Sequence, residues 1–191
     1  ADGAWATSPG FPQVLVDDNT TAYPDPVGVP LTCGKTYWVY NKNVLDDGYY
    51  GRLWDGRSWQ AEERATVAHS SRGLYSLAAE GDRVHLVFGG GKIRYRARDA
   101  ANGWGEAFQV ASAGSGHASI TRTGPNSLVV TWLDKSLDSV CYREMDNGRW
   151  GEPQRWLDES RAHLANTELG INSAALAESA GPFKLAVAYT T

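Results

Sequence analysis

Four segments of the chain alternate between large apolar residues and other residues, and each segment ends in an aromatic side chain. In the second segment Leu86 lies two positions before Phe88, and in the third Val130 lies two positions before Trp132. A period of two over five or six residues predicts a β-strand packed along one face. The four segments span residues 36–40, 84–88, 128–132 and 184–189.

Each of these segments follows a stretch of small or apolar residues and a short turn rich in Gly, Asp, Asn or Pro. The pattern predicts a first strand that pairs with the segment after the turn. These first strands are predicted at residues 25–29, 75–79, 118–122 and 172–176.

A third strand is predicted at residues 93–98, where apolar residues alternate with arginines. Because long charged side chains keep their head groups in water, we expect the arginine side of this strand to be a solvated face. The arginines concerned are Arg94, Arg96, Arg98 and, in the next copy, Arg143.

A tryptophan that follows a Gly/Asp turn closes each unit, at Trp59, Trp104 and Trp150, and Trp5 is an isolated fourth example. The unit therefore repeats about every 45 residues, a period typical of propeller blades built from four short strands. We expect the fourth strand of each unit to begin at the tryptophan and to continue through the next few residues. Pro153 is acceptable there because an outermost strand needs fewer backbone donors.

The predicted fold is all-β: a β-propeller of four-stranded antiparallel blades of about 45 residues, with three complete blades and two partial ones. Three readings of the closed ring follow: four blades closed by pairing the two ends, a segment of a longer six- or seven-bladed chain, or a ring completed by another copy of this chain. The predicted boundaries are an outer strand in 1–12, blades in 13–65, 66–112 and 113–160, and a partial blade in 161–191.

Composition narrows the classes of partner. The 191 residues carry a net charge of −4 with no basic cluster, which argues against nucleic acid and against an acidic membrane surface as partners. No apolar run approaches the length needed for a membrane-spanning helix.

The repeats resemble those of the sialidase-like superfamily of β-propellers, which carry BNR or Asp-box repeats. The resemblance rests on the I-x-Y-R type strands and on the D-x-G-x-W type turns, although Leu53 and Glu144 stand where an Asp-box has Ser or Thr. The matching segments are residues 93–96, 140–143, 55–59 and 146–150. The same turns are similar to those of fucose-binding propeller lectins. Both resemblances imply an extracellular, secreted protein whose partner is a glycan or polysaccharide.

Loops that enter the first strands, and loops between second and third strands, usually share one rim of a propeller. Carboxylates, amides, an arginine, a histidine and a tyrosine on such a rim suit recognition of sugar hydroxyls and sugar rings. The predicted ligand-binding residues are Asp25, Arg72, Tyr75, His117, Asp134 and Asn172.

An enzyme, either a glycoside hydrolase or a polysaccharide lyase, is the alternative. Asp25 and the strand after it resemble the first blade of arabinanase-type glycosidases, which carries the catalytic base. Glycoside cleavage needs a second carboxylate, for which Asp134 is a candidate, and His117 is a candidate base for a lyase. A binding protein predicts equivalent sites in equivalent blades, whereas an enzyme predicts one asymmetric site in the central channel.

A third alternative is a structural propeller that binds other proteins. No cofactor is expected, because no cluster of Cys, His, Asp or Glu has metal-ligand spacing. The acidic pairs at 17–18 and 46–47 are the only hints of calcium.

Overall fold

The computed structural model describes residues 14–16, 25–42, 48–66, 75–89, 91–112, 118–134, 139–158, 171–175 and 185–189, the last two segments and 156–158 by their backbone alone. These residues form sixteen β-strands and one short 3-10 turn, Thr32–Gly34. Within this part of the chain, no helix has the length and hydrophobicity that crossing a membrane requires.

The strands form three antiparallel sheets with the same order, here named the first, second and third blades, and a fourth, two-stranded sheet. The first blade contains β1 (Val27–Pro30), β2 (Thr36–Asn41), β3 (Tyr49–Trp54) and β4 (Glu63–Arg64). The second contains β5 (Tyr75–Glu80), β6 (Arg83–Gly89), β7 (Ile93–Asp99), β8 (Gly103–Trp104) and β9 (Phe108–Ala111). The third contains β10 (Ala118–Gly124), β11 (Ser127–Asp134), β12 (Ser139–Asp146), β13 (Arg149–Trp150) and β14 (Gln154–Asp158). The two-stranded sheet pairs β15 (Ile171–Ala175) with β16 (Leu185–Tyr189).

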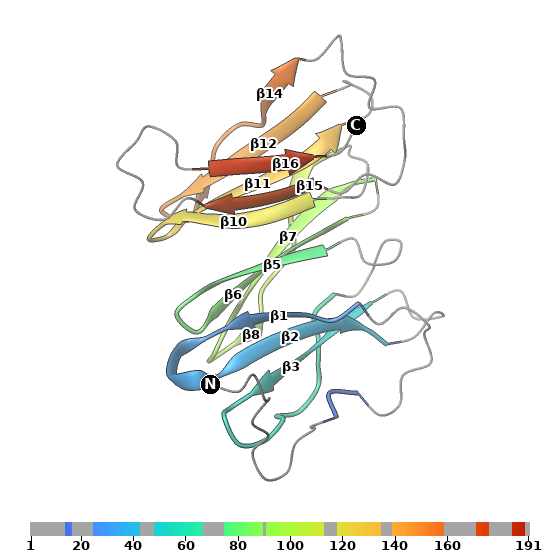
Figure 1. Cartoon of the computed structure of the whole chain (residues 1–191), viewed down its shortest axis with the longest axis vertical. Helices are drawn as coiled ribbons and strands as arrows, with labels where there is room; N and C mark the ends of the chain where they lie inside the picture. Colours follow the sequence, from blue (N-terminus) through green and yellow to red (C-terminus); the bar gives the residue numbers. More distant parts are fainter. Residues whose placement is uncertain are drawn as a thin grey trace, which may run out of the picture.

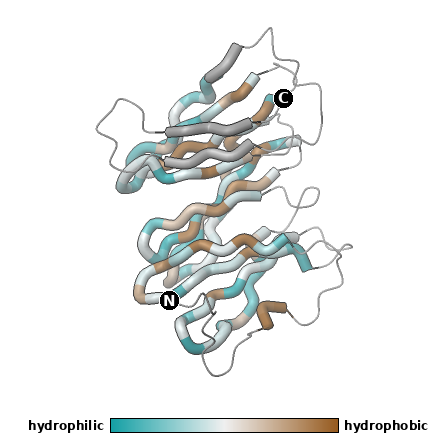
Figure 2. Tube along the Cα trace, viewed as in Figure 1, coloured by the Kyte–Doolittle hydropathy of each residue, from teal (hydrophilic) through white to brown (hydrophobic). Residues whose placement is uncertain are grey.

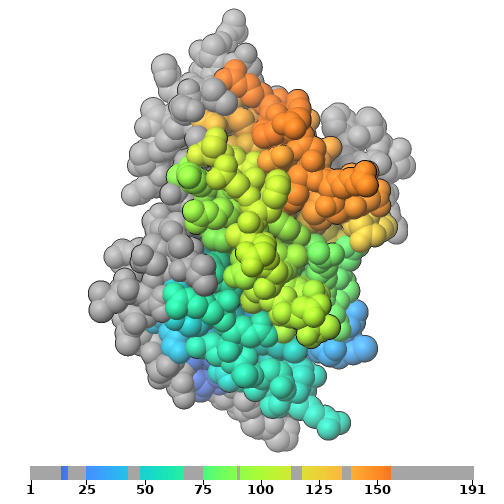
Figure 3. All heavy atoms as spheres, turned by 180° about the vertical axis from the view of Figure 1, so that it is seen from behind, coloured from blue at the N-terminus to red at the C-terminus, as the bar shows by residue number. Residues whose placement is uncertain are grey.

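The blades follow one another along the long axis of the molecule, as Figure 1 shows. Their first strands are neighbours, since β5 contacts β1 and β10, and β10 contacts β15. Seen from behind, in Figure 3, the second blade (green) lies between the first (teal) and the third (orange). The predicted all-β propeller architecture, with its sheets of short antiparallel strands, is confirmed.

The outermost strand of a blade is not continuous, which corrects the prediction. In the second blade β8 pairs with the end of β7 and β9 pairs with its beginning, and residues 105–107 separate them. At the interruption the N–H of Gly105 still donates to the carbonyl of Ala97 at 2.8 Å. Pro153 lies in the same interruption of the third blade, between β13 and β14, where it displaces no ladder hydrogen bond.

The hydrophobic core lies between the blades. One cluster joins residues of the first and second blades, among them Val39 and Leu86, and another joins the second and third blades through Tyr95 and Val130. Figure 2 shows the apolar residues recurring along the strands of all three blades. Each face of the central blade is therefore covered by a neighbour, and burial of apolar area between sheets is the main stabilising term.

The expectation of a solvated face was wrong for Arg96, Arg98 and Arg143, because that face of the second and third blades packs against the preceding blade. Arg98 is only 7 % exposed. Arg96 and Arg143 are partly buried and donate hydrogen bonds to backbone carbonyls of the preceding blade. The alternating pattern was read correctly, but Arg98 on its arginine side is buried and Arg96 and Arg143 are partly buried.

One arginine recurs at the same place in all three blades: Arg52, Arg96 and Arg143, opposite Trp38, Leu86 and Val130 respectively. In each blade its Nε donates to the carbonyl that follows the repeat tryptophan, that of Gln60 (3.2 Å), Gly105 (2.7 Å) or Gly151 (2.6 Å).

The terminal nitrogens of the same arginines reach an outer segment that comes earlier in the chain. Arg96 donates to the carbonyl of Ala65, and Arg143 donates to that of Val110 at 2.9 Å. Arg52 donates to the carbonyl of Leu15 at 2.8 Å, so residues 14–16 lie where the outer strand of a blade before the first would lie. We call this residue the bridging arginine.

Replacing a bridging arginine should loosen two blades at once. Arg96→Met leaves the carbonyl of Ala65, a fully buried residue, without its guanidinium donor. We expect the free energy of unfolding to fall by about 1–3 kcal/mol, the usual cost of stranding a buried polar group. Urea denaturation followed by tryptophan fluorescence measures it.

Arg94→Met is the matched control, since Arg94 lies on the same strand and has no side-chain hydrogen bond within the described residues. It should change the free energy of unfolding by less than about 0.5 kcal/mol. Equal losses in the two variants would contradict the bridging role.

Candidate functional site

The predicted rim residues that the structure describes lie where first strands begin and second strands end. Asp25 is exposed, two residues before β1, with a φ of 38°. Tyr75, the first residue of β5, is buried, and its hydroxyl lies within hydrogen-bond distance of two acceptors, the carbonyl of Val39 at 2.9 Å and that of Asp25. Burial raises the pKa of this hydroxyl above its usual range, so it stays protonated. Tyr75 thus ties the second blade to the first.

Asp134 ends β11 opposite Ser139 and is 8 % exposed. Asn172 lies in β15 opposite Ala188, and its side chain is not described. Arg72, His117 and the acidic pairs at 17–18 and 46–47 lie outside the described residues. The rim site therefore stays a prediction.

Within the part of the chain that the structure describes, no group of three or more His, Cys, Asp or Glu side chains is placed to hold a metal ion.

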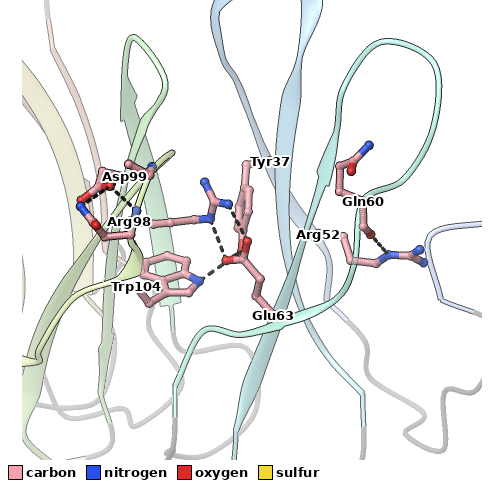
Figure 4. Close-up of polar contacts among 9 residues, drawn as sticks. Tyr37, Arg52, Gln60, Glu63, Arg98, Asp99 and Trp104 are labelled. Atoms are coloured by element: carbon pink, nitrogen blue, oxygen red, sulfur yellow. Dashed lines mark hydrogen bonds and ion pairs between the residues drawn. The ribbon is translucent and has the colours of Figure 1, made fainter.

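A polar cluster lies between the first and second blades, and Figure 4 shows it in close-up. We call it the first junction; it consists of Tyr37, Glu63, Arg98 and Trp104. Nε of Arg98 donates to Oε2 of Glu63 at 2.7 Å, and a terminal guanidinium nitrogen donates to Oε1 at 2.5 Å. The Tyr37 hydroxyl donates to Oε2 at 3.2 Å and accepts the indole N–H of Trp104 at 3.1 Å.

Local sequence explains how this cluster forms. Glu63, the first residue of β4, lies opposite Gly51 of β3. A side chain at Gly51 would collide with the Tyr37 ring, so the glycine makes room for the phenol beside Glu63. Arg98, the penultimate residue of β7, extends from the second blade to meet the carboxylate.

In the first junction the negative charge of Glu63 is balanced by the guanidinium of Arg98, and its carboxylate also accepts a hydrogen bond from Tyr37. The Arg98 side chain is 8 % exposed and that of Glu63 is 31 % exposed. Hydrogen bonding to Glu63 raises the pKa of Arg98, and burial raises the pKa of Tyr37, so both keep their protons. Oε1 accepts one of the hydrogen bonds described here, whereas a carboxylate oxygen can accept two. The partly exposed carboxylate can therefore accept a further hydrogen bond from a ligand.

The equivalent place between the second and third blades, the second junction, has different chemistry. There Phe108 takes the position of Glu63, and its ring stacks on Trp150 with centroids 5.3 Å apart and an interplanar angle of 4°. Nδ1 of His85 and the Tyr95 hydroxyl lie 2.7 Å apart, and the Tyr95 ring packs edge-on against Trp150 at 5.1 Å.

Sequence reasoning missed the first junction. Glu63 attracted no attention, and Arg98 was expected to face solvent. A signal was present in the repeats, since the position four residues after the repeat tryptophan is Glu63 in one copy and Phe108 in the next. Because the residue type at this position differs between copies, the blade structure does not require one particular side chain there.

No protein-family model matches this chain, and no curated protein matches it in sequence. Solved structures do. A point mutant of Aleuria aurantia lectin in complex with Fucα1-6GlcNAc matches with a TM-score of 0.56 and 18 % identity, over 85 % of this chain and 52 % of the lectin. The same lectin in complex with α-methyl-L-fucoside matches with a TM-score of 0.54 and 20 % identity, over 80 % of this chain and 48 % of the lectin.

A triple mutant of AofleA from Arthrobotrys oligospora matches with a TM-score of 0.52 and 9 % identity, over 73 % of this chain and 44 % of AofleA. The chain thus spans about half the length of the proteins it matches. At these identities the likeness shows a shared propeller fold.

His85 predicts a pH dependence of stability. The side chain is 1 % exposed, and burial, with the nearby Arg83, lowers its pKa from 6.5 to about 4. The folded state therefore binds a proton less readily than the unfolded state does. The stabilisation is complete above about pH 6.5 and is lost as the pH falls toward 4, by about 3 kcal/mol.

Urea denaturation at a series of pH values from 4 to 7.5 measures this loss. Carboxylates also titrate in that range, so His85→Gln is the control: its stability should fall less steeply than that of the wild type. Parallel curves for the two proteins would contradict the assignment to His85.

Proposed function

We propose that this chain recognises carbohydrate and that the first junction is the binding site. The observation that carries the proposal is the partly exposed Glu63 carboxylate, held by the buried Arg98 beside the tryptophan of the next blade. The fold supports it, because a propeller lectin with a similar structure has been solved with α-methyl-L-fucoside and with Fucα1-6GlcNAc.

The chemistry of the first junction suits a sugar. A hydroxyl group of the ligand would donate to the charged carboxylate, which forms a stronger hydrogen bond than a neutral acceptor. The C–H face of the ring would lie against the partly exposed indole of Trp104, whose orientation is held by its hydrogen bond to Tyr37. Since the protein groups already hold one another, little side-chain entropy would be lost on binding.

We propose an extracellular glycan as the partner. The predicted rim residues are a second place where such a ligand could bind, and the experiment below separates the two places. The catalytic candidates Asp25, Asp134 and His117 stay predictions, because glycoside cleavage depends on a pair of groups in one site and His117 lies outside the described residues.

We also propose that further blades complete the ring. The hydrogen bond from Arg52 to Leu15 supports it, because residues 14–16 then take an outer position before the first blade. These blades would come from pairing of the two ends of this chain, from a longer chain or from a second copy. Native mass spectrometry of the 191-residue chain tests these sources: a discrete dimer would support the second copy, and a folded monomer at all concentrations would support one of the other two.

Isothermal titration with α-methyl-L-fucoside and Fucα1-6GlcNAc tests the binding site. Glu63→Gln removes the charge that would accept the sugar hydroxyl, and we expect at least a tenfold loss of affinity, or about 1.4 kcal/mol. Circular dichroism checks that the variant stays folded, because Arg98 loses its charged partner.

Two controls accompany this variant. Glu62→Gln changes a neighbouring carboxylate of similar exposure, paired with Lys42, and should leave affinity unchanged. Asp25→Asn should also have no effect. A loss in Asp25→Asn with none in Glu63→Gln would move the site to the rim, and no binding to either probe or to any sugar of a glycan array would overturn the proposed function.

A further inference from the structure

Each of the three blades contains the bridging arginine and the repeat tryptophan, which lie near the outermost strand of the sheet. The bridging arginine donates to backbone carbonyls in every blade, and its guanidinium also lies near an aromatic ring, at 5.8 Å from Trp59, 5.8 Å from Trp104 or 5.0 Å from Phe108. In each blade the donors of the bridging arginine are thus used by contacts within the protein. The bridging arginine therefore holds the blades together and leaves little capacity for a ligand, whereas the repeat tryptophan is partly exposed in each blade.

The residues that differ between blades occupy the remaining positions of each junction. Strand register makes Glu63 equivalent to Phe108, since they lie opposite Gly51 and Tyr95. It also makes Arg98 equivalent to Met145, because Val84 and Leu128 are their partners on the second strands. The first junction thus has a carboxylate and a guanidinium at the positions where the second has a phenyl ring and a thioether.

The second junction has no comparable acceptor among its described side chains. Met145 is 6 % exposed and belongs to the core between the second and third blades. The Phe108 ring covers one face of Trp150, and Tyr95 packs edge-on against the same indole. A sugar ring would have to displace Phe108 to reach that face, and no carboxylate would then bind its hydroxyls.

We propose that Glu63 and Arg98 are the specificity-determining residues of this chain, and that of its two described junctions only the first binds a hydroxyl-bearing ligand. The repeated arginine and tryptophan form a scaffold that is common to both junctions. This inference rests on the proposed function. It also reverses the expectation that a binding propeller has equivalent sites in equivalent blades.

The test converts the first junction into a copy of the second by the double substitution Glu63→Phe and Arg98→Met. The second junction shows that this pair of residues packs between blades, and replacing a buried ion pair by apolar residues is often neutral for stability. We expect a folded protein with at least a tenfold lower affinity for α-methyl-L-fucoside and Fucα1-6GlcNAc. Circular dichroism and isothermal titration measure the two properties.

The matched variant is Phe108→Ala, which removes the exposed ring from the second junction. It should leave both the affinity and the stoichiometry unchanged from those of the wild type. A loss of binding in Phe108→Ala, or full affinity with unchanged stoichiometry in the double variant, would each overturn the inference while leaving carbohydrate binding intact. If the wild type binds neither probe nor any sugar of a glycan array, the proposed function fails and the inference fails with it.

Discussion

The rest of this structure depends on the hydrogen bonds that the bridging arginine donates to backbone carbonyls of its own blade and of the adjacent one. The outer strand of each blade is interrupted, and an interrupted strand leaves backbone carbonyls without ladder partners. Arginine suits this place because its planar group carries five donors in a fixed geometry. In the second blade Arg96 uses them for Gly105 and Trp104 of its own sheet and for Ala65 of the first. Arg96 and Arg143 thereby tie their blades to the preceding one at backbone carbonyls of the buried residues Ala65 and Val110.

The same constraint separates structure from function along the chain. A residue that satisfies backbone carbonyls in every blade cannot change without loss of stability, so the repeat preserves it. The position four residues after the repeat tryptophan does not bond these carbonyls in every blade. It is Glu63 at the first junction and Phe108 at the second. The charged residues of the proposed site, Glu63 and Arg98, accordingly differ from their equivalents in the next blade. The bridging arginine and the repeat tryptophan are the same in every blade.

Much of the fold could be predicted because local patterns encode it. The two-residue period located β2, β6 and β11, and the turn residues located the strands before them. The first junction could not be predicted in the same way. Glu63 and Arg98 are 35 residues apart in the chain and meet only because two blades pack face to face. The Tyr75 hydroxyl likewise bonds the carbonyl of Val39, in another blade.

The sequence by itself determined the strands, the blade repeat and the all-β class, because these follow from side-chain periodicity and turn chemistry within about ten residues. Only the tertiary structure decided which faces are buried. The alternating pattern places the Arg98 side chain on the opposite face of the sheet from the apolar side chains of its strand. It does not determine whether water or another sheet covers that face. A propeller covers both faces of an inner blade, so a charged residue there needs hydrogen-bond partners in the neighbouring blade, and Arg98 finds Glu63 of the preceding blade.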